Sequence, residues 1–388
     1  MAASGAGQAD RRDSDASATG VPQSSSSFEI AQSKDAFTFI VLGASGDLAK
    51  KKTYPALFEL YCAQLLPRNV QIIGYARSKL SDEDLRERLH PFLDKKANEL
   101  AGDAPDKLDA FLKLCTYSQG QYDSPDDMKK TAEAATEREA ELTETGRANR
   151  IFYLAVPPTV FVDAARTARE GGFGSSGWNR VVVEKPFGHD SASSAALSRS
   201  MKSLLNEEEM YRIDHYLGKE MVQNLMVLRF ANAVFEPLWN REHVSMVTIT
   251  FKEPFGTEGR EGYFDKFGIV RDILQNHLLQ VLSIVAMEPP VSLAAEDVRD
   301  EKVKVLRCVP PIRPQDVVVG QYGASSDGER KAYRDGSPEV SDSTAPTFCT
   351  AVLWVHNRRW AGVPFVLKAG KALNERKAEI RIQFRDPP

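Results

Sequence analysis

The run of residues 37–42 (Phe-Thr-Phe-Ile-Val-Leu) and the glycine turn after it constrain the fold more than any other stretch of this chain. A short, nearly continuous apolar run is typical of a parallel strand that is covered on both faces. It is followed by Gly43-Ala-Ser-Gly46 and by a helical pattern that continues to about Ala63. This order of buried strand, glycine turn and helix predicts the opening unit of an α/β domain.

Strands and helices go on alternating along the next part of the chain. We predict further strands at residues 70–76, 151–156 and 181–184. Helices open at two capping sequences, Ser81-Asp-Glu-Asp84 and Ser124-Pro-Asp-Asp127. Because such alternation is typical of parallel sheets, we predict a Rossmann-like, doubly wound sheet over residues 36–210.

The pattern changes after about residue 210. One long, strongly apolar helix is predicted at residues 269–287, and strands of alternating polarity are predicted at residues 244–252, 317–321, 351–355, 364–368 and 379–384. A chain of 388 residues is also too long for one small core. We therefore predict a β+α domain over residues 211–388, with a large, mainly antiparallel sheet and helices on one face.

Composition and charge exclude several classes of protein. The formal net charge is −4, so no general affinity for nucleic acid or anionic membranes is expected. No apolar run approaches the length of a membrane span. The six histidines show no metal-ligand spacing and the four cysteines form no close pair, so we predict no metal site.

Residues 1–35 are rich in Ser, Ala, Gly and Asp, and we predict that they form a disordered tail. The tail lacks the apolar core of a secretory signal, and its acidic residues argue against a mitochondrial transit peptide. Widely spaced cysteines are typical of reduced thiols inside the cell. We therefore expect a cytoplasmic protein and leave an organellar pool open.

The glycine turn is the first candidate binding site. Gly43 and Gly46 would let a pyrophosphate approach bare N–H groups at a helix N-terminus. The alternative for this pair alone is a plain strand-to-helix turn. Lys50 lies in the first helical turns, and Arg77 follows the second strand. NAD-specific folds usually place an acid there, whereas an Arg can bind a 2′-phosphate, so we predict NADP rather than NAD. The alternative for Arg77 is a surface salt bridge.

The second candidate site is the segment Arg212-Ile-Asp-His-Tyr-Leu-Gly-Lys-Glu220. If this segment is helical, His215 and Lys219 lie four residues apart on one face and can grip a phosphate. Asp214 would then point elsewhere and be free for another role. The alternative is ordinary surface charge.

His277 is a candidate general base. A lone histidine in an apolar helix is more often a hydrogen-bonded core residue. A base oriented by a carboxylate, for which Asp214 is available, could instead take a proton from an alcohol while hydride leaves.

Other charged residues are candidates for contacts to an anionic sugar. Glu253 and Asp272 can accept hydrogen bonds from hydroxyls, or they are ordinary surface acids. Lys185 precedes Pro186, and a cis or trans bond there would direct its ammonium. A further basic cluster suggests an anionic ligand or a solvated loop, and it comprises Lys368, Lys371, Arg376 and Lys377.

Six motifs, taken together and in order, resemble the glucose-6-phosphate dehydrogenase family. The Arg212–Glu220 motif is the most specific of them, and the glycine turn is the least. They cover the chain from residue 43 to residue 377, and they are Gly43-Ala-Ser-Gly-Asp-Leu-Ala-Lys50, Glu184-Lys-Pro-Phe-Gly188, Arg212-Ile-Asp-His-Tyr-Leu-Gly-Lys-Glu220, Phe251-Lys-Glu-Pro-Phe-Gly-Thr-Glu-Gly259, Gln275-Asn-His-Leu-Leu279 and Gly370-Lys-Ala-Leu-Asn-Glu-Arg-Lys377.

The resemblance implies NADP-dependent oxidation of D-glucose 6-phosphate to 6-phospho-D-glucono-1,5-lactone, the first step of the oxidative pentose phosphate pathway. It implies that His277 is the general base and that Asp214 orients it. The implied substrate-binding residues are Lys185, His215, Tyr216, Lys219, Glu253, Asp272, Lys371 and Arg376. The implied NADP-binding residues are Gly43, Ala44, Ser45, Gly46, Asp47, Leu48, Lys50, Arg77, Tyr153 and again Lys185.

The resemblance also implies a homodimer or homotetramer built on the large sheet when the protein is full length. The sequence stops at Pro388, where the family continues, so we expect a fragment that lacks part of that sheet. An open strand edge after Phe384 would be prone to pairing or aggregation. Lys368 stands where members with a structural NADP site carry an Arg, so no second NADP is predicted.

Two rival functions remain. One is a dehydrogenase of an unphosphorylated sugar, against which the two basic clusters argue. The other is a non-catalytic protein that senses NADPH, against which the presence of both Asp214 and His277 argues.

Overall fold

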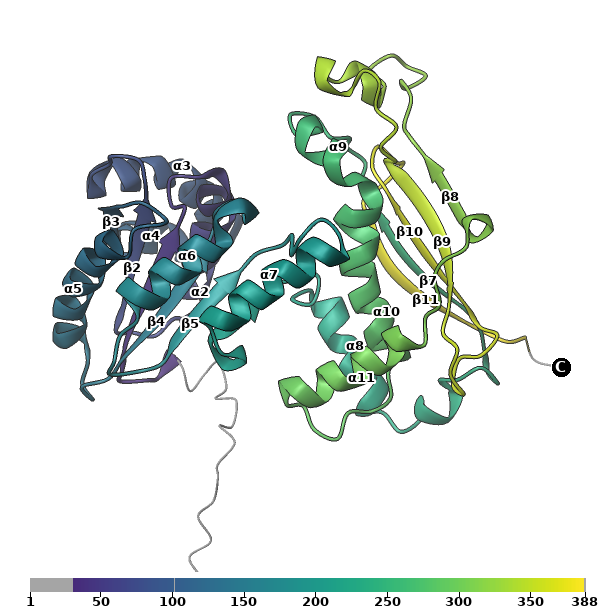
Figure 1. Cartoon of the computed structure of the whole chain (residues 1–388), viewed down its shortest axis with the longest axis horizontal. Coiled ribbons are helices and arrows are strands. Elements are labelled where there is room, and N and C mark those ends of the chain that lie inside the picture. The colour runs from purple at the N-terminus through teal and green to yellow at the C-terminus, as the bar shows by residue number, and fades with distance from the viewer. Residues whose placement is uncertain (1–30, 101, 387–388) are drawn as a thin grey trace, which may run out of the picture.

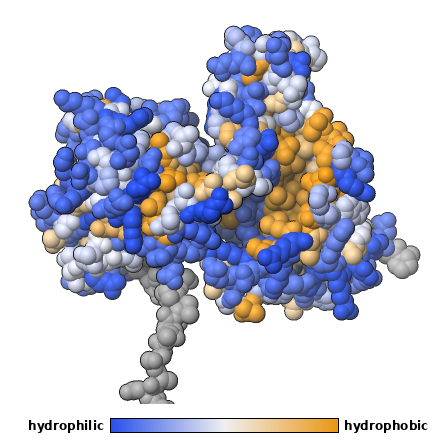
Figure 2. Space-filling model, viewed as in Figure 1, coloured by the Kyte–Doolittle hydropathy of each residue, from blue (hydrophilic) through white to orange (hydrophobic). Residues whose placement is uncertain are grey.

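The computed structural model describes residues 31–100 and 102–386, which form two lobes (Figure 1). Residues 1–30 of the predicted tail lie outside the described residues. The first lobe holds a six-stranded sheet and the second a five-stranded sheet. Figure 2 shows that the surface is hollowed between the two lobes. The predicted boundary at residue 210 stays a prediction.

The first sheet has the strand order β3-β2-β1-β4-β5-β6, and all its pairings are parallel. This is the dinucleotide-binding order, in which the chain reverses direction across the sheet at β1 and β4. The doubly wound prediction is therefore confirmed. The strands are β1 (Ala36–Leu42), β2 (Val70–Ala76), β3 (Cys115–Gln119), β4 (Ala148–Leu154), β5 (Asn179–Val183) and β6 (Met210–Arg212).

Helices cover both faces of this sheet, each face with its own apolar core. Ser81 and Asp84 form the predicted reciprocal cap, and Ser124 accepts a hydrogen bond from the N–H of Asp127. The main helices are α2 (Tyr54–Cys62), α3 (Asp82–Leu100), α4 (Ala104–Lys113), α5 (Pro125–Leu142), α6 (Phe161–Thr167) and α7 (Ser191–Leu204).

The second sheet has the order β11-β7-β10-β9-β8 and is mainly antiparallel, as predicted, with one parallel pairing between β7 and β10. Its strands are β7 (Val244–Lys252), β8 (Val317–Gly320), β9 (Phe348–Trp354), β10 (Pro364–Gly370) and β11 (Lys377–Phe384). Helices lie on the face that is turned toward the first lobe (Figure 1). They are α8 (Glu220–Phe230), α9 (Glu261–Ile269), α10 (Leu279–Ala286) and α11 (Ala295–Arg307), with the π-helical stretch η6 (Val270–Leu278) between α9 and α10.

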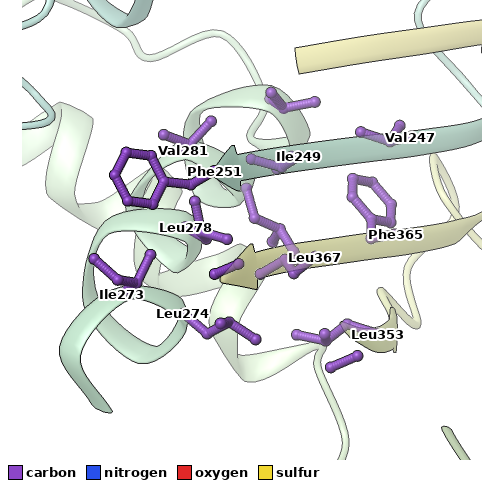
Figure 3. Packing of buried hydrophobic residues seen from close by; sticks show 14 of the residues in the cluster. Val247, Ile249, Phe251, Ile273, Leu274, Leu278, Val281, Leu353, Phe365 and Leu367 are labelled. Carbon is purple, nitrogen blue, oxygen red and sulfur yellow. The ribbon is translucent and has the colours of Figure 1, made fainter. Parts of the chain in front are cut away.

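The apolar helix predicted at residues 269–287 is therefore η6 followed by α10. Figure 3 shows Ile273, Leu274 and Leu278 of η6 directed at Ile249 and Leu367 of the sheet. This packing fixes the helix that carries His277. A π-helical stretch widens the turn, and such stretches are frequent at functional sites.

One buried ion pair joins α5 to the centre of the first sheet. Arg150 and Glu139 are 2% and 4% exposed. Arg150 donates from Nε to Oε1 at 2.8 Å and from Nη2 to Oε2 at 2.7 Å, and Thr38 also donates to Oε1. A bidentate, fully bonded pair is the arrangement in which buried charges are tolerated.

We expect Glu139→Ala to lower the free energy of unfolding by about 3–5 kcal/mol, because it leaves the Arg150 guanidinium buried without a counter-charge. Urea denaturation measures this change. The matched control is Glu141→Ala, which removes the exposed pair with Arg138 on the same helix and should cost less than about 1 kcal/mol. Equal losses for the two variants would contradict the assignment.

Candidate active site

The glycine turn forms a close-packed cradle at the carboxyl end of β1. Gly43 has a φ of +89°, and a Cβ there would lie 2.3 Å from the carbonyl oxygen of Ala155. Its N–H donates to the carbonyl of Tyr75 at 2.8 Å. A side chain at Gly46 would meet the carbonyl oxygen of Gly43 at 3.1 Å. The turn therefore needs glycine for its shape, as does a turn that lets a pyrophosphate approach the start of a helix.

The side chains around this cradle carry both signs of charge. Asp47 pairs with Lys51 at 2.8 Å and with Lys50 at 3.3 Å, and these hydrogen bonds lower the pKa of the Asp47 carboxyl. Ser45 Oγ lies 3.3 Å from Ser78 Oγ, which links the turn to the end of β2. Ala44 is buried and Leu48 is exposed.

Arg77 lies beside the same turn, one residue past β2. Its guanidinium is 5.5 Å from the centroid of the Tyr122 ring. Among the described residues, no carboxylate forms an ion pair with Arg77. The surface salt bridge considered as its alternative role is thus not formed there, and the guanidinium is available to an anion.

Tyr153, on β4, extends the site along the carboxyl edge of the sheet. Its hydroxyl donates to Glu184 Oε1 at 2.5 Å. Glu184 follows β5 directly and precedes Lys185. Burial, together with this hydrogen bond and the charge of Glu184, raises the pKa of Tyr153. Glu184 was not among the predicted site residues, although it stands in one of the six motifs.

Residues 212–220 do not form a helix, so the prediction that His215 and Lys219 share a helical face is wrong. Arg212 ends strand β6, and the N–H of Ile213 still bonds to the carbonyl of Val183. Two turns follow. In the first, the N–H of Leu217 donates a hydrogen bond to the carbonyl of Asp214, and in the second, the N–H of Lys219 donates to the carbonyl of Tyr216. Hydrogen bonds to β5 hold residues 210–213 in an extended conformation in spite of the helical spacing, and α8 begins only at Glu220.

Asp214 and His277 meet across the two lobes. His277 Nδ1 lies 2.5 Å from Asp214 Oδ1, and the histidine side chain is fully buried. Burial raises the pKa of the Asp214 carboxyl, but the hydrogen bond and charge of His277 outweigh it and leave that pKa below its usual value. An ionised Asp214 can only accept a hydrogen bond, so it fixes the proton of His277 on Nδ1 and leaves Nε2 without one.

Nε2 of His277 is also buried and has no hydrogen-bond partner within residues 31–100 and 102–386. Buried polar nitrogens in proteins are nearly always paired, so an orphan here suggests that a ligand supplies the missing group. This geometry is what a general base needs.

His215 follows Asp214 in the turn and packs against the Asp214–His277 pair, which is called the dyad below. Its ring centroid lies 4.5 Å from that of His277. Burial lowers the pKa of His215 to about 4, and the charges of Lys185, Lys219 and a protonated His277 act in the same direction. Without a ligand, His215 is therefore neutral at neutral pH.

Tyr216 is buried beneath the dyad. Its ring stacks on His277 with 4.1 Å between centroids, and Lys219 Nζ is 4.7 Å from the same ring. The tyrosine hydroxyl has no partner in the described part of the chain. Phe251, the first residue of one of the six motifs, packs edge-on against the ring. It was not predicted as a site residue, because a single apolar residue of a strand gives no signal of such a contact.

Two lysines of the predicted site are held by carboxylates of the same site. Lys185 is joined to Pro186 by a cis peptide bond. Its ammonium donates to the Asp272 carbonyl at 3.0 Å and lies 3.3 Å from Asp272 Oδ1. Lys371 lies 2.5 Å from Glu253 Oε2. The first pair joins the two lobes and the second joins the ends of β10 and β7.

Other cations of the site remain unpaired. No ion pair of Lys219 or Arg376 occurs among the described residues, whereas Lys377 pairs with Glu379 at 2.9 Å. The charges of Glu253, Asp272 and Arg376 all act on the Tyr216 hydroxyl. The structure therefore brings the predicted substrate residues together around Tyr216.

Lys302, on α11, also lies close enough to Asp214 for the carboxylate to act on its charge, although burial lowers the pKa of Lys302 overall. No sequence motif pointed to it. Among the described residues, no three His, Cys, Asp or Glu side chains are arranged to hold a metal ion. No helix of that part of the chain is long and apolar enough to span a membrane.

Comparison with protein families identifies the chain. The family model described as "Glucose-6-phosphate dehydrogenase, NAD binding domain" matches residues 40–224, and "Glucose-6-phosphate dehydrogenase, C-terminal domain" matches residues 226–388. The chain belongs to the glucose-6-phosphate dehydrogenase family. It is therefore an oxidoreductase with a domain that binds a nicotinamide nucleotide.

Relatives and solved structures agree with this family. Glucose-6-phosphate 1-dehydrogenase of Emericella nidulans is 51% identical over 91% of this chain and 68% of its own length. The enzyme of the same name from Dictyostelium discoideum is 53% identical over 92% of this chain and 70% of its own. A structure of glucose-6-phosphate dehydrogenase in complex with glucose-6-phosphate superposes with a TM-score of 0.86, at 50% identity, over 92% of this chain and 73% of that chain.

The environment of His215 makes a testable prediction about pH. An unperturbed histidine has a pKa of about 6.5, whereas His215 in the fold has one of about 4. Below about pH 6.5 the unfolded chain therefore takes up a proton that the folded chain refuses, and this site's contribution to stability falls as the pH drops toward 4.

We expect the NMR resonances of the His215 ring to titrate near pH 4 in the ligand-free protein. His215→Asn assigns the signal, and its unfolding free energy should lose the pH dependence that His215 contributes in this window. A midpoint at or above pH 6.5 would show that neither burial nor the neighbouring cations lower the pKa of the ring.

Proposed function

We propose that this chain oxidises D-glucose 6-phosphate to 6-phospho-D-glucono-1,5-lactone with NADP. The observation that carries the proposal is the buried contact between His277 and Asp214, beside a group of unpaired cations. A base next to a phosphate-binding region suits a phosphorylated alcohol as the substrate. The reaction would be the first step of the oxidative pentose phosphate pathway.

The dyad supplies the base for this reaction. Asp214 holds Nδ1–H of His277, so Nε2 can take the proton of the C1 hydroxyl as the C1–H bond breaks and the lactone carbonyl forms. The ionised carboxylate then stabilises the imidazolium. A nicotinamide nucleotide bound at the glycine turn would supply the acceptor for the hydride that leaves C1.

The phosphate is proposed to bind Lys219, His215 and Arg376. Lys219 and Arg376 have no ion pair of their own among the described residues, so they can meet a phosphate without first losing another partner. A phosphate dianion beside His215 would raise the pKa of its ring and favour the protonated, doubly donating form.

The sugar hydroxyls are proposed to contact the two lysine–carboxylate pairs. Glu253 and Asp272 each keep acceptor capacity beyond their lysine, because a carboxylate offers about four acceptor positions. Hydroxyls can insert beside the Lys371–Glu253 and Lys185–Asp272 contacts without leaving a charge unpaired. This arrangement favours a polyhydroxylated ligand.

The cofactor is proposed to be NADP, held at the glycine turn. Gly43 and Gly46 provide a cradle that side chains would fill, and residues 43–48 with Lys50 line it. Arg77, without a carboxylate partner in the described chain, is available to the 2′-phosphate. Tyr153 and Lys185 lie on the same edge of the sheet, at the ends of β4 and β5.

Assembly and location are further proposals. We propose that the full-length protein forms a homodimer or homotetramer through the large sheet and works in the cytoplasm. The chain spans 68% and 70% of the lengths of the two relatives described above. Activity is therefore best tested on this chain and on a C-terminally extended one in parallel.

We expect His277→Asn to lower kcat for NADP reduction about 10²–10⁴-fold, because the variant keeps a similar shape but cannot accept the proton. NADPH absorbance with glucose 6-phosphate as substrate measures the rate. His243→Asn, an exposed histidine outside the site, is the matched control. Unchanged turnover in His277→Asn would refute the general base.

The same assay separates the rival sugar dehydrogenase. With the phosphate bound by Lys219, His215 and Arg376, glucose should be oxidised far more slowly than glucose 6-phosphate at equal concentration. Equal rates with the two sugars would favour the rival function.

We expect Arg77→Ala to raise KM for NADP about 10- to 100-fold and to leave KM for NAD nearly unchanged, because a charge-assisted hydrogen bond to the 2′-phosphate is worth roughly 1.5–3 kcal/mol. Initial rates with each nucleotide measure the effect. Arg68→Ala, an exposed arginine on the same lobe, serves as the control. Equal changes for NADP and NAD would show that Arg77 does not read the 2′-phosphate.

A further inference from the structure

Tyr216 contacts both members of the dyad. Its backbone N–H donates to Asp214 Oδ1 at 3.0 Å, and the same oxygen accepts His277 Nδ1 at 2.5 Å. Its ring stacks on the His277 imidazole, with centroids 4.1 Å apart and the planes only 16° from parallel. One residue therefore touches the orienting carboxylate through its main chain and the base through its side chain.

The ring of Tyr216 is itself held in place. The residue is 4% exposed, and Phe251 of β7 packs against the ring edge-on, at 5.3 Å and 72°. The backbone on either side is fixed by the turn hydrogen bonds that Leu217 and Lys219 donate to Asp214 and Tyr216. The ring is thus a rigid surface rather than a loose filler.

We propose that the ring of Tyr216 is a positioning element for the His277 base, a role distinct from any contact that its hydroxyl makes with the substrate. This inference rests on the proposed function, in which His277 removes the proton. It adds a third member to the unit that carries out that step.

The physical reason is that one hydrogen bond does not fix an imidazole. A ring held only at Nδ1 can still rock about that bond and swing Nε2 away from the hydroxyl it must reach. A stacked aromatic ring removes this freedom. The face of a tyrosine ring also carries negative charge density, which favours the imidazolium that forms when His277 takes the proton.

The hydroxyl of Tyr216 can be separated from its ring. It is buried without a partner in the described chain, so its loss breaks no internal hydrogen bond. Tyr216→Phe keeps the stacked ring and removes the hydroxyl, whereas Tyr216→Leu removes both. Comparison of the two variants isolates the ring.

We expect Tyr216→Phe to raise KM for glucose 6-phosphate several-fold while kcat stays within about threefold of the parent. Tyr216→Leu should lower kcat about 10- to 100-fold. Since the imidazolium is then less stabilised, the acid limb of its kcat–pH profile should also move to lower pH. Asp214 and His215, the titratable groups against the His277 ring, remain in each variant.

Phe365→Leu provides the matched packing control. It removes an aromatic ring from the same apolar core, where that ring packs edge-on against Trp360, so it should lower the unfolding temperature but leave the kcat–pH profile in place. If Tyr216→Leu does not fold, Tyr216→Met, which fills more of the same space, replaces it. A normal kcat and pH profile in the variants without the ring would overturn the proposal, as would a kcat in Tyr216→Phe as low as theirs.

A second measurement does not depend on turnover. The stacked ring should shift the NMR signals of the His277 ring protons upfield in the parent and in Tyr216→Phe, and Tyr216→Leu should abolish the shift and broaden the signals through rocking. If the parent chain did not oxidise glucose 6-phosphate, the proposed function would fail while these spectra still tested the positioning role. Sharp, unshifted signals in the parent would overturn it.

Discussion

The 2.5 Å contact between Asp214 and His277 is the interaction on which the rest of the site depends. It joins the end of the first sheet to the helix that covers the second sheet, so it can form only when both lobes are folded and correctly placed. It also fixes the proton on Nδ1 and leaves Nε2 free. In the proposed function, the glycine turn that would hold the cofactor and the cations that would hold the substrate lie on either side of this contact.

Each lobe supports the contact by a different physical means. In the first lobe, hydrogen bonds of the parallel sheet carry the backbone to Ile213, and two tight turns present the residues after it. In the second lobe, apolar side chains of η6 pack against β7 and β10 (Figure 3), and this packing fixes the helix that carries His277. Backbone hydrogen bonding sets one partner and burial of apolar area sets the other.

Some of the cations around this contact have a carboxylate partner and others have none among the described residues. Lys185 and Lys371 already have carboxylate partners, whereas Arg77, Lys219 and Arg376 form no ion pair within the described chain. The paired lysines are held in place by their carboxylates when no ligand is bound. The unpaired cations leave a positive potential that attracts phosphate groups. The proposed anions therefore coincide with the places where the protein leaves its own charge uncompensated.

Local patterns of apolar residues predicted much of the fold, and β1, β2 and β7 lie where these patterns placed them. A strand that is buried on both faces has a continuous apolar run, and a strand that is buried on one face alternates apolar and polar residues. Short polar strands such as β3 and β6 were missed because they carry no such pattern. The helical prediction for residues 212–220 failed because pairing with β5 outweighs spacing. The sequence supplied the residues of the site, but contacts between residues far apart in the chain, such as the stacking of Tyr216 on His277, were decided only when the two lobes packed together.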